Sequence, residues 1–129
     1  MPGKAAAVES GRDLEEKVAA IGARLGLKVE RQVKVGRRIW GAQRRIDVVL
    51  KDTHTRVSLG VECKFQGSAG SAEEKIPATI EDIGAWPIRG LVVYAGEGFS
   101  ENLKAFLLST GKAVELEDLE TWLELYFGL

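Results

Sequence analysis

Charged residues interrupt two otherwise apolar segments of this 129-residue chain. In VSLGVECKF (residues 57–65), Glu62 and Lys64 are two positions apart, so an extended strand places both on one face and Cys63 on the other. In RIDVVL (residues 45–50), Asp47 stands between apolar residues. A hairpin that joins these segments would set Asp47 beside Glu62, since cross-strand neighbours lie about 4.5–5.5 Å apart.

Two carboxylates this close repel each other unless a cation compensates their charge. A hard divalent cation such as Mg²⁺ prefers oxygen ligands and commonly binds one or two carboxylates, waters and substrate phosphates. Lys64 could then orient or help deprotonate a metal-associated water, or neutralise charge that develops on a phosphate. These residue types therefore predict metal-dependent hydrolysis of a phosphodiester.

The composition excludes several other kinds of chemistry. The single cysteine, Cys63, and the single histidine, His54, exclude an internal disulfide and a Cys/His zinc site. They also argue against papain-like proteases and Ser-His-Asp hydrolases. We expect Cys63 to be a small core residue and His54 to lie in an exposed loop.

Length and hydropathy indicate one compact domain over residues 11–129, after a flexible segment over residues 1–10. No apolar run is long enough to cross a bilayer, and the first ten residues do not resemble a signal peptide. We therefore expect an intracellular, cytoplasmic protein without membrane contact, located in the host cytoplasm if a phage encodes it.

The net charge of −1 conceals two opposite halves. Residues 1–64 contain 14 Lys+Arg against 8 Asp+Glu, whereas residues 65–129 contain 4 against 11. The positive excess is concentrated in residues 28–45, and its density suits a polyanion. The alternative is a solvated strand and loop that balance the acidic half. The residues expected to hold the phosphate backbone are Arg37, Arg38, Arg44 and Arg45.

Apolar spacing, caps and chain breakers predict the elements that must position these residues. Ser10 and Gly26 bound the first helix, and Pro77 lies inside or kinks the second, which Ser71 caps. Helices are predicted over residues 12–25, 72–83, 100–108 and 118–127, and strands over residues 28–35, 45–50, 57–65, 90–94 and 112–116, with a turn over residues 36–41. The order α-β-β-β-α-β-α-β-α predicts an α/β (α+β) fold with helices flanking a central mixed sheet.

The spacing of Asp47, fourteen intervening residues and then Glu62-Cys63-Lys64 resembles the PD-(D/E)xK nuclease superfamily. This superfamily includes many restriction endonucleases, archaeal Holliday-junction resolvases and phage nucleases. Ile46 rather than proline precedes Asp47, which is a common variation. The resemblance implies a restriction-endonuclease-like core.

By this resemblance, Asp47, Glu62 and the backbone carbonyl of Cys63 would bind the metal, and Lys64 would serve the water. In the superfamily, a helix that precedes the hairpin often carries a glutamate in a pattern matched here by Gly11, Leu14 and Glu15. Glu16 is the alternative, because one residue on a helix turns the side chain by about 100°.

The segment after the motif extends the resemblance. Gln66 corresponds to a glutamine that lies next to the catalytic strand in some of these nucleases, and Lys75 to a lysine that approaches nucleic acid. Trp40 could stack on a base, or it could anchor a loop as a half-buried aromatic. Trp86 and Trp122 lie in apolar settings and are expected in the core.

The sequence thus predicts an endonuclease that uses Mg²⁺ or Mn²⁺ and acts on DNA with selectivity for structure, such as a branch or flap, or with weak sequence specificity. RNA stays open as a substrate. Cutting both strands would need two active sites, which suggests a homodimer. Two alternatives remain: a catalytically silent nucleic-acid-binding member of the same fold, and a protein-interaction module that uses the acidic C-terminal helix.

Overall fold

The computed structural model describes residues 10–37, 43–67 and 76–129. Within these ranges the elements follow the predicted order, so the α/β fold is confirmed. They are α2 (Gly11–Arg24), β1 (Lys28–Arg37), β2 (Gln43–Lys51), β3 (Ser58–Phe65), α3 (Ile76–Ile83), β4 (Arg89–Ala95), α4 (Glu101–Thr110), β5 (Ala113–Glu115), the 3-10 turn η2 (Leu116–Asp118) and α5 (Leu119–Phe127). None of the helices in these ranges is long and apolar enough to span a membrane.

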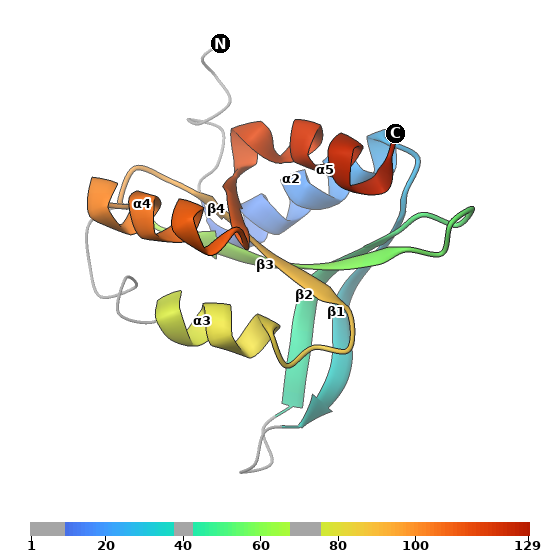
Figure 1. The fold of residues 1–129 in the computed structure, drawn as a ribbon, viewed down its shortest axis with the longest axis horizontal. Helices are drawn as coiled ribbons and strands as arrows, with labels where there is room; N and C mark the ends of the chain where they lie inside the picture. Colours follow the sequence, from blue (N-terminus) through green and yellow to red (C-terminus); the bar gives the residue numbers. More distant parts are fainter. Residues whose placement is uncertain (1–9, 38–42, 68–75) are drawn as a thin grey trace.

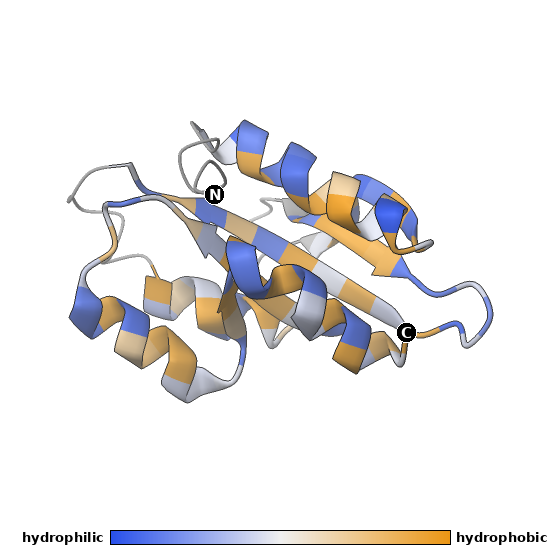
Figure 2. Cartoon of the chain, turned by 90° about the horizontal axis from the view of Figure 1, so that it is seen from above, coloured by the Kyte–Doolittle hydropathy of each residue, from blue (hydrophilic) through white to orange (hydrophobic). Residues whose placement is uncertain are grey.

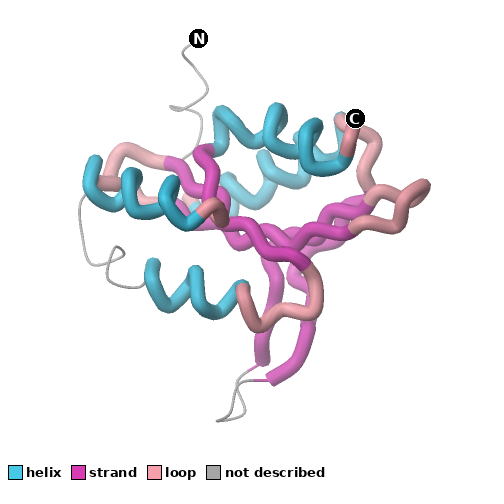
Figure 3. The backbone as a smooth tube through the Cα atoms, viewed as in Figure 1, coloured by secondary structure: helices cyan, strands magenta, loops and turns pink. Residues whose placement is uncertain are grey.

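The five strands form one mixed sheet in the order β1-β2-β3-β4-β5. β1, β2 and β3 pair antiparallel, whereas β3, β4 and β5 pair parallel, as two crossovers through α3 and α4 require. The pairing of β2 with β3 ends at Val48 opposite Val61. The next positions, Asp47 and Glu62, therefore face each other where the two strands begin to separate. Figure 3 shows that the β1–β2 ribbon continues past the helices.

Helices cover both faces of the sheet (Figure 1). α2 and α5 lie on one face, where Leu14, Val18 and Leu123 join a buried cluster with apolar residues of β2, β3 and β4. α3 and α4 lie on the other face with Ile83 and Leu107. Figure 2 shows hydrophilic and hydrophobic residues alternating along these elements, which is the pattern that buries one side of each helix. The sheet is thus held between two apolar layers.

The predicted boundaries of the first helix are confirmed. The Ser10 side chain accepts a hydrogen bond from the Asp13 amide at 3.0 Å, and Gly26, with φ 85°, follows the helix end. Pro77 lies in the first described turn of α3, and the helix continues through it from Ile76 to Ile83. Ser71 and the predicted start of this helix lie outside the described residues.

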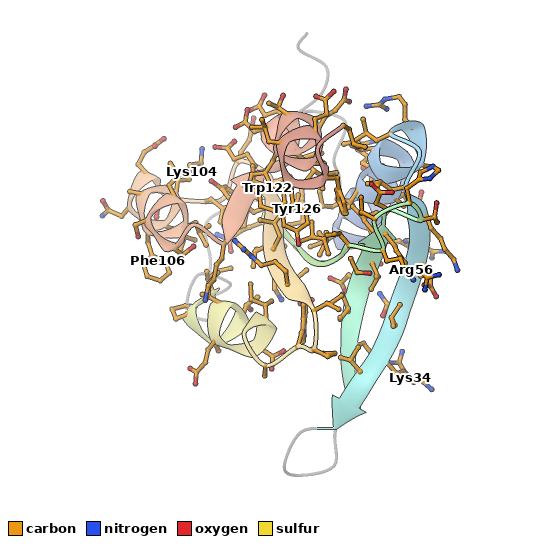
Figure 4. All side chains as sticks on the ribbon, turned by 45° about the vertical axis from the view of Figure 1, so that its right-hand side comes forward. Lys34, Arg56, Lys104, Phe106, Trp122 and Tyr126 are labelled. Carbon is orange, nitrogen blue, oxygen red and sulfur yellow. The ribbon has the colours of Figure 1, made fainter. Side chains whose placement is uncertain are left out.

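Three other predictions are corrected. β1 extends to Arg37, because Gly36 pairs with Arg44 across an irregularity in the ladder, so the predicted turn begins too early. The last strand is shorter than predicted, since Leu116 already belongs to η2. Trp122 is only partly buried and stacks on Tyr126 at a centroid distance of 5.1 Å, at the surface of α5 (Figure 4).

The remaining core predictions are confirmed. Trp86 and Cys63 are buried, while His54 is exposed in the turn between β2 and β3. Trp40 lies outside the described residues.

Gly96, directly after β4, offers a test of this packing. Its φ is 111°, and an added Cβ would overlap the backbone carbonyl of Gln66, which cannot move aside as a flexible side chain could. We expect Gly96→Ala to lower the free energy of unfolding by about 3 kcal/mol or more. Gly111→Ala is the matched control, since its φ is 67° but the space around it is open; it should cost about 1 kcal/mol. Equal losses in urea denaturation would contradict the close packing at Gly96.

Candidate active site

Asp47 is held at the point where β2 and β3 separate. Its Oδ2 accepts a hydrogen bond from the backbone N–H of Cys63 at 2.9 Å, which takes the place of a ladder bond after Val61. Because the N–H and C=O of one strand residue point to the same edge, the carbonyl of Cys63 also faces the side of β2. A carboxylate and a backbone carbonyl therefore share this edge of β3.

The Cys63 side chain is directed differently from its backbone. It is buried in the cluster beneath α2. Burial, followed by the charge of Asp47, raises the pKa of the Cys63 thiol well above its ordinary value. Because this side chain is buried among apolar residues and a hard cation prefers oxygen donors, the backbone carbonyl is the group of Cys63 that suits a metal site.

Glu62 and Lys64 flank Cys63 and project from the other face of β3. Lys64 Nζ lies 3.4 Å from Glu62 Oε2, and the two side chains are 35% and 21% exposed, respectively. Burial raises the pKa of Glu62 to about 7, and the charge of Asp47 acts in the same direction, while Lys64 opposes both. Asp47 and Glu62, which the sequence predicts to be neighbours, are thus close enough for the charge of Asp47 to add to the effect of burial on the pKa of Glu62.

On α2 the structure distinguishes Glu15 from Glu16. Glu15 Oε1 accepts a hydrogen bond from Gln32 Nε2 at 3.0 Å and lies 3.4 Å from the Arg31 guanidinium. Glu16 instead pairs with Arg12 at 3.7 Å on the exposed side of the helix. Of these two glutamates, Glu15 therefore faces β1, the strand that pairs with β2 and its Asp47.

Gln32 connects the helix to the hairpin, although the sequence analysis did not single it out. Besides Glu15, its Nε2 donates to Asp47 Oδ1 at 3.4 Å. Its φ of 51° lies in the left-handed region, which is unusual for a residue with a side chain inside a strand. A glutamine in a polar strand carries no sequence signal for this conformation. Only the fold reveals its contacts.

Gln66 directly follows the end of β3 and is 5% exposed. Its Nε2 donates to the Gly98 carbonyl at 2.6 Å, and its own backbone carbonyl accepts from the Gly98 N–H at 2.8 Å. Its Oε1 has no hydrogen-bond partner within the described ranges. The contacts of Gln66 fasten the loop between β4 and α4 to the end of β3.

The predicted phosphate-binding residues are only partly described. Arg45 is exposed on β2, and Lys34 is exposed on β1 (Figure 4). Arg37 and Arg44 belong to β1 and β2, but their side chains, like the whole of Arg38 and Lys75, lie outside the described part of the chain.

The donors at the hairpin fit a hard cation. In the part of the chain that the structure describes, no three His, Cys, Asp or Glu side chains form a ready-made metal centre. Asp47, Glu62 and the Cys63 carbonyl would supply two carboxylates and one carbonyl. Oxygen donors in this number match Mg²⁺, which usually keeps several waters and completes its shell with substrate phosphates.

A pocket of about 570 Å³ is lined by other residues. Its walls come from α2, the end of β4, α4 and the segment leading into α5. They include Lys17, Ile21, Arg24, Lys104 and Glu120. None of the predicted site residues lines it, so the pocket is not the site that the charged strands form.

Comparisons with known proteins concern the family and the fold of the chain. The family model of the PD-(D/E)XK nuclease superfamily domain matches residues 6–124. The crystal structure of AF1548, a protein of unknown function, is similar with a TM-score of 0.54 and 20% identity, over 78% of this chain and 55% of that protein. VC1899 from Vibrio cholerae is similar with a TM-score of 0.51 and 18% identity, over 89% of this chain and 32% of that protein.

These two likenesses concern the fold alone. The chain spans about half of AF1548 and a third of VC1899. No match was found among curated proteins.

The raised pKa of Glu62 gives a pH-dependent prediction. Its pKa is about 7 in the folded protein against 4.5 in the unfolded chain, so the stability that it contributes is present below pH 4.5 and is lost as the pH rises through 7. We expect Glu62→Gln to raise the melting temperature at pH 8 in EDTA by roughly 5 °C, and to leave it nearly unchanged at pH 4. Thermal unfolding followed by circular dichroism tests this. The same difference at both pH values would show that the charge of Glu62 is not the cause.

Proposed function

The chain belongs to the PD-(D/E)XK nuclease superfamily, and on this basis we propose that it is a divalent-metal-dependent endonuclease that hydrolyses phosphodiester bonds in DNA. The observation that carries the proposal is the hydrogen bond from the Cys63 N–H to Asp47 Oδ2, which fixes one carboxylate opposite Glu62. Lys64, 3.4 Å from Glu62, completes the set of groups that such hydrolysis needs.

Asp47, Glu62 and the carbonyl of Cys63 are the proposed ligands of Mg²⁺ or Mn²⁺. When bound, the metal would polarise a phosphoryl oxygen and lower the pKa of a coordinated water. The carboxylates would need little movement to hold the cation, because the Cys63 amide already orients Asp47 and burial limits the freedom of Glu62.

Lys64 is proposed to act on the water and on the phosphate. Its side chain is one-third exposed and extends from the same face of β3 as Glu62, so the ammonium can reach solvent and the substrate. It would hold the attacking water by a hydrogen bond and offset the negative charge that develops on the phosphate. Glu15, which shares the Gln32 amide with Asp47, would orient the same hydration shell.

Contacts with DNA are proposed for the basic residues of β1, β2 and the segments beyond them. Arg45 is the described member, and it would contact the phosphate backbone rather than bases. Because contacts with the phosphate backbone carry no sequence information directly, selectivity for branched or flap structure fits better than a long recognition site. Two copies of the chain would be needed to cut both strands.

Cleavage assays test the proposal. Labelled single-stranded, duplex, flap and four-way-junction DNA would be incubated with Mg²⁺, Mn²⁺ or EDTA. We expect metal-dependent cutting by the wild type and a loss of about 100-fold or more in Asp47→Ala, Glu62→Ala and Lys64→Ala, because each removes a group that acts on the reacting atoms. Binding without cutting in any metal would indicate the silent member of the fold. Neither binding nor cutting would favour the interaction module.

The two helix glutamates provide a matched pair. Glu15→Ala should lower the cleavage rate by about 10-fold or more, because its carboxylate lies in the network around Asp47. Glu16→Ala should cut like the wild type, since its side chain pairs only with Arg12 on the exposed side. Single-turnover rates at saturating metal measure both. Equal effects of the two substitutions would remove Glu15 from the proposed site.

A further inference from the structure

Gln32 adopts a backbone conformation that its position in the strand does not require. Its φ is 51°, yet Arg31 and Val33 on either side keep regular register with Val48 and Ile46 of β2. Residues with a Cβ avoid this left-handed region because the side chain crowds the following carbonyl. Such a conformation persists only where its surroundings hold it in place.

The contacts of Gln32 explain what this conformation achieves. Successive side chains of a regular strand point to opposite faces. Here, however, the side chains of both Arg31 and Gln32 reach Glu15 Oε1, at 3.4 Å and 3.0 Å. The left-handed residue therefore turns two consecutive donors toward the same carboxylate.

The Gln32 amide also completes the restraint on Asp47. Asp47 Oδ2 accepts from the Cys63 amide at 2.9 Å, and Oδ1 lies 3.4 Å from Gln32 Nε2. Each oxygen thus has a donor from a different strand, which fixes the rotation of the carboxylate plane. Because an amide carries no charge, Gln32 brings Glu15 and Asp47 together without competing as a cation for their remaining lone pairs.

We propose that Gln32 is a positioning residue of the nuclease site, which holds Glu15 and Asp47 in the orientation that metal binding needs. The inference rests on the proposed function. In this role the amide touches the two carboxylates and not the reacting atoms. The unfavourable backbone conformation is retained because it aims the amide at both of them.

The test compares three variants of Gln32, namely Gln32→Ala, Gln32→Gly and Gln32→Asn, with the wild type and with control variants in which Arg56 is replaced. Arg56, with φ 65°, is the matched control, because it has the same left-handed backbone in the turn between β2 and β3 (Figure 4). None of the contacts described for the site involves it. Arg56→Ala and Arg56→Gly should cut DNA as the wild type does.

We expect all three Gln32 variants to lose about 10- to 100-fold in kcat/KM and to require more Mg²⁺ for half-maximal cleavage. Asparagine tolerates a left-handed backbone, but its amide is one methylene shorter, so a purely structural role would leave Gln32→Asn active. At both Gln32 and Arg56, the glycine variant of the protein should be more stable than the alanine variant, because only glycine accepts a positive φ freely. This is the reverse of the usual order of the two residues in a strand. Gln32→Gly should therefore gain stability over Gln32→Ala without regaining activity.

Two outcomes would overturn the inference. The first outcome is that the wild type cuts DNA and that Gln32→Ala has the same kcat/KM and the same Mg²⁺ requirement. This outcome would leave the proposed function intact. The other concerns metal binding itself, read from the rise in melting temperature that Mn²⁺ causes. This rise should be larger for the wild type than for Gln32→Ala, and equal rises would contradict positioning even if no DNA substrate is cut. Failure of the wild type to cut any substrate would count against the proposed function alone.

Discussion

The structure must hold carboxylates from different elements close together against their mutual repulsion. Asp47 and Glu62 come from adjacent strands. Burial, and after it the charge of Asp47, raises the pKa of Glu62 to about 7, which shows that holding the two charged groups here is unfavourable. Hydrogen-bond donors reduce this cost. The Cys63 amide, the Gln32 amide and the Lys64 ammonium each offset part of the negative charge.

The apolar core keeps these charged groups in register. Leu14 and Val18 pack α2 against β2 and β3. This packing fixes the rotation of the helix and so directs Glu15 toward the strands. In the same way, Val48 and Val61 are fully buried and form the last pair of the β2–β3 ladder. A slip of one residue there would move each side chain of the strand to the opposite apolar layer and disrupt the packing of both, so the register that serves the core also sets Asp47 opposite Glu62.

These dependences explain which parts of the site could be predicted from the sequence. The hairpin followed from two β-rich segments joined by a short polar turn, so Asp47 could be expected beside Glu62. The register that sets them opposite each other came from the structure. Glu15 needed the family resemblance to be preferred over Glu16. Gln32 could not be predicted as a site residue, because neither its left-handed backbone nor its contacts with α2 and β2 produce a local pattern in the sequence. The ends of β1 at Arg37 and of β5 at Glu115 show the same limit at element boundaries, where a local preference is compatible with more than one end point.

The small number of protein donors at the hairpin has a consequence for the proposed activity. Two carboxylates and one carbonyl leave an octahedral cation with positions that only waters or phosphate oxygens can fill. A cation held in this way is bound more firmly when the substrate supplies a ligand, so occupancy of the site and binding of DNA would reinforce each other. The orientation of Asp47 then matters more than the strength of any single bond, because a ligand set this sparse has no spare donor to compensate for one that is turned away. The neutral amide of Gln32 and the backbone amide of Cys63 are suited to this task, since both restrain the carboxylate while leaving its negative charge available to the cation.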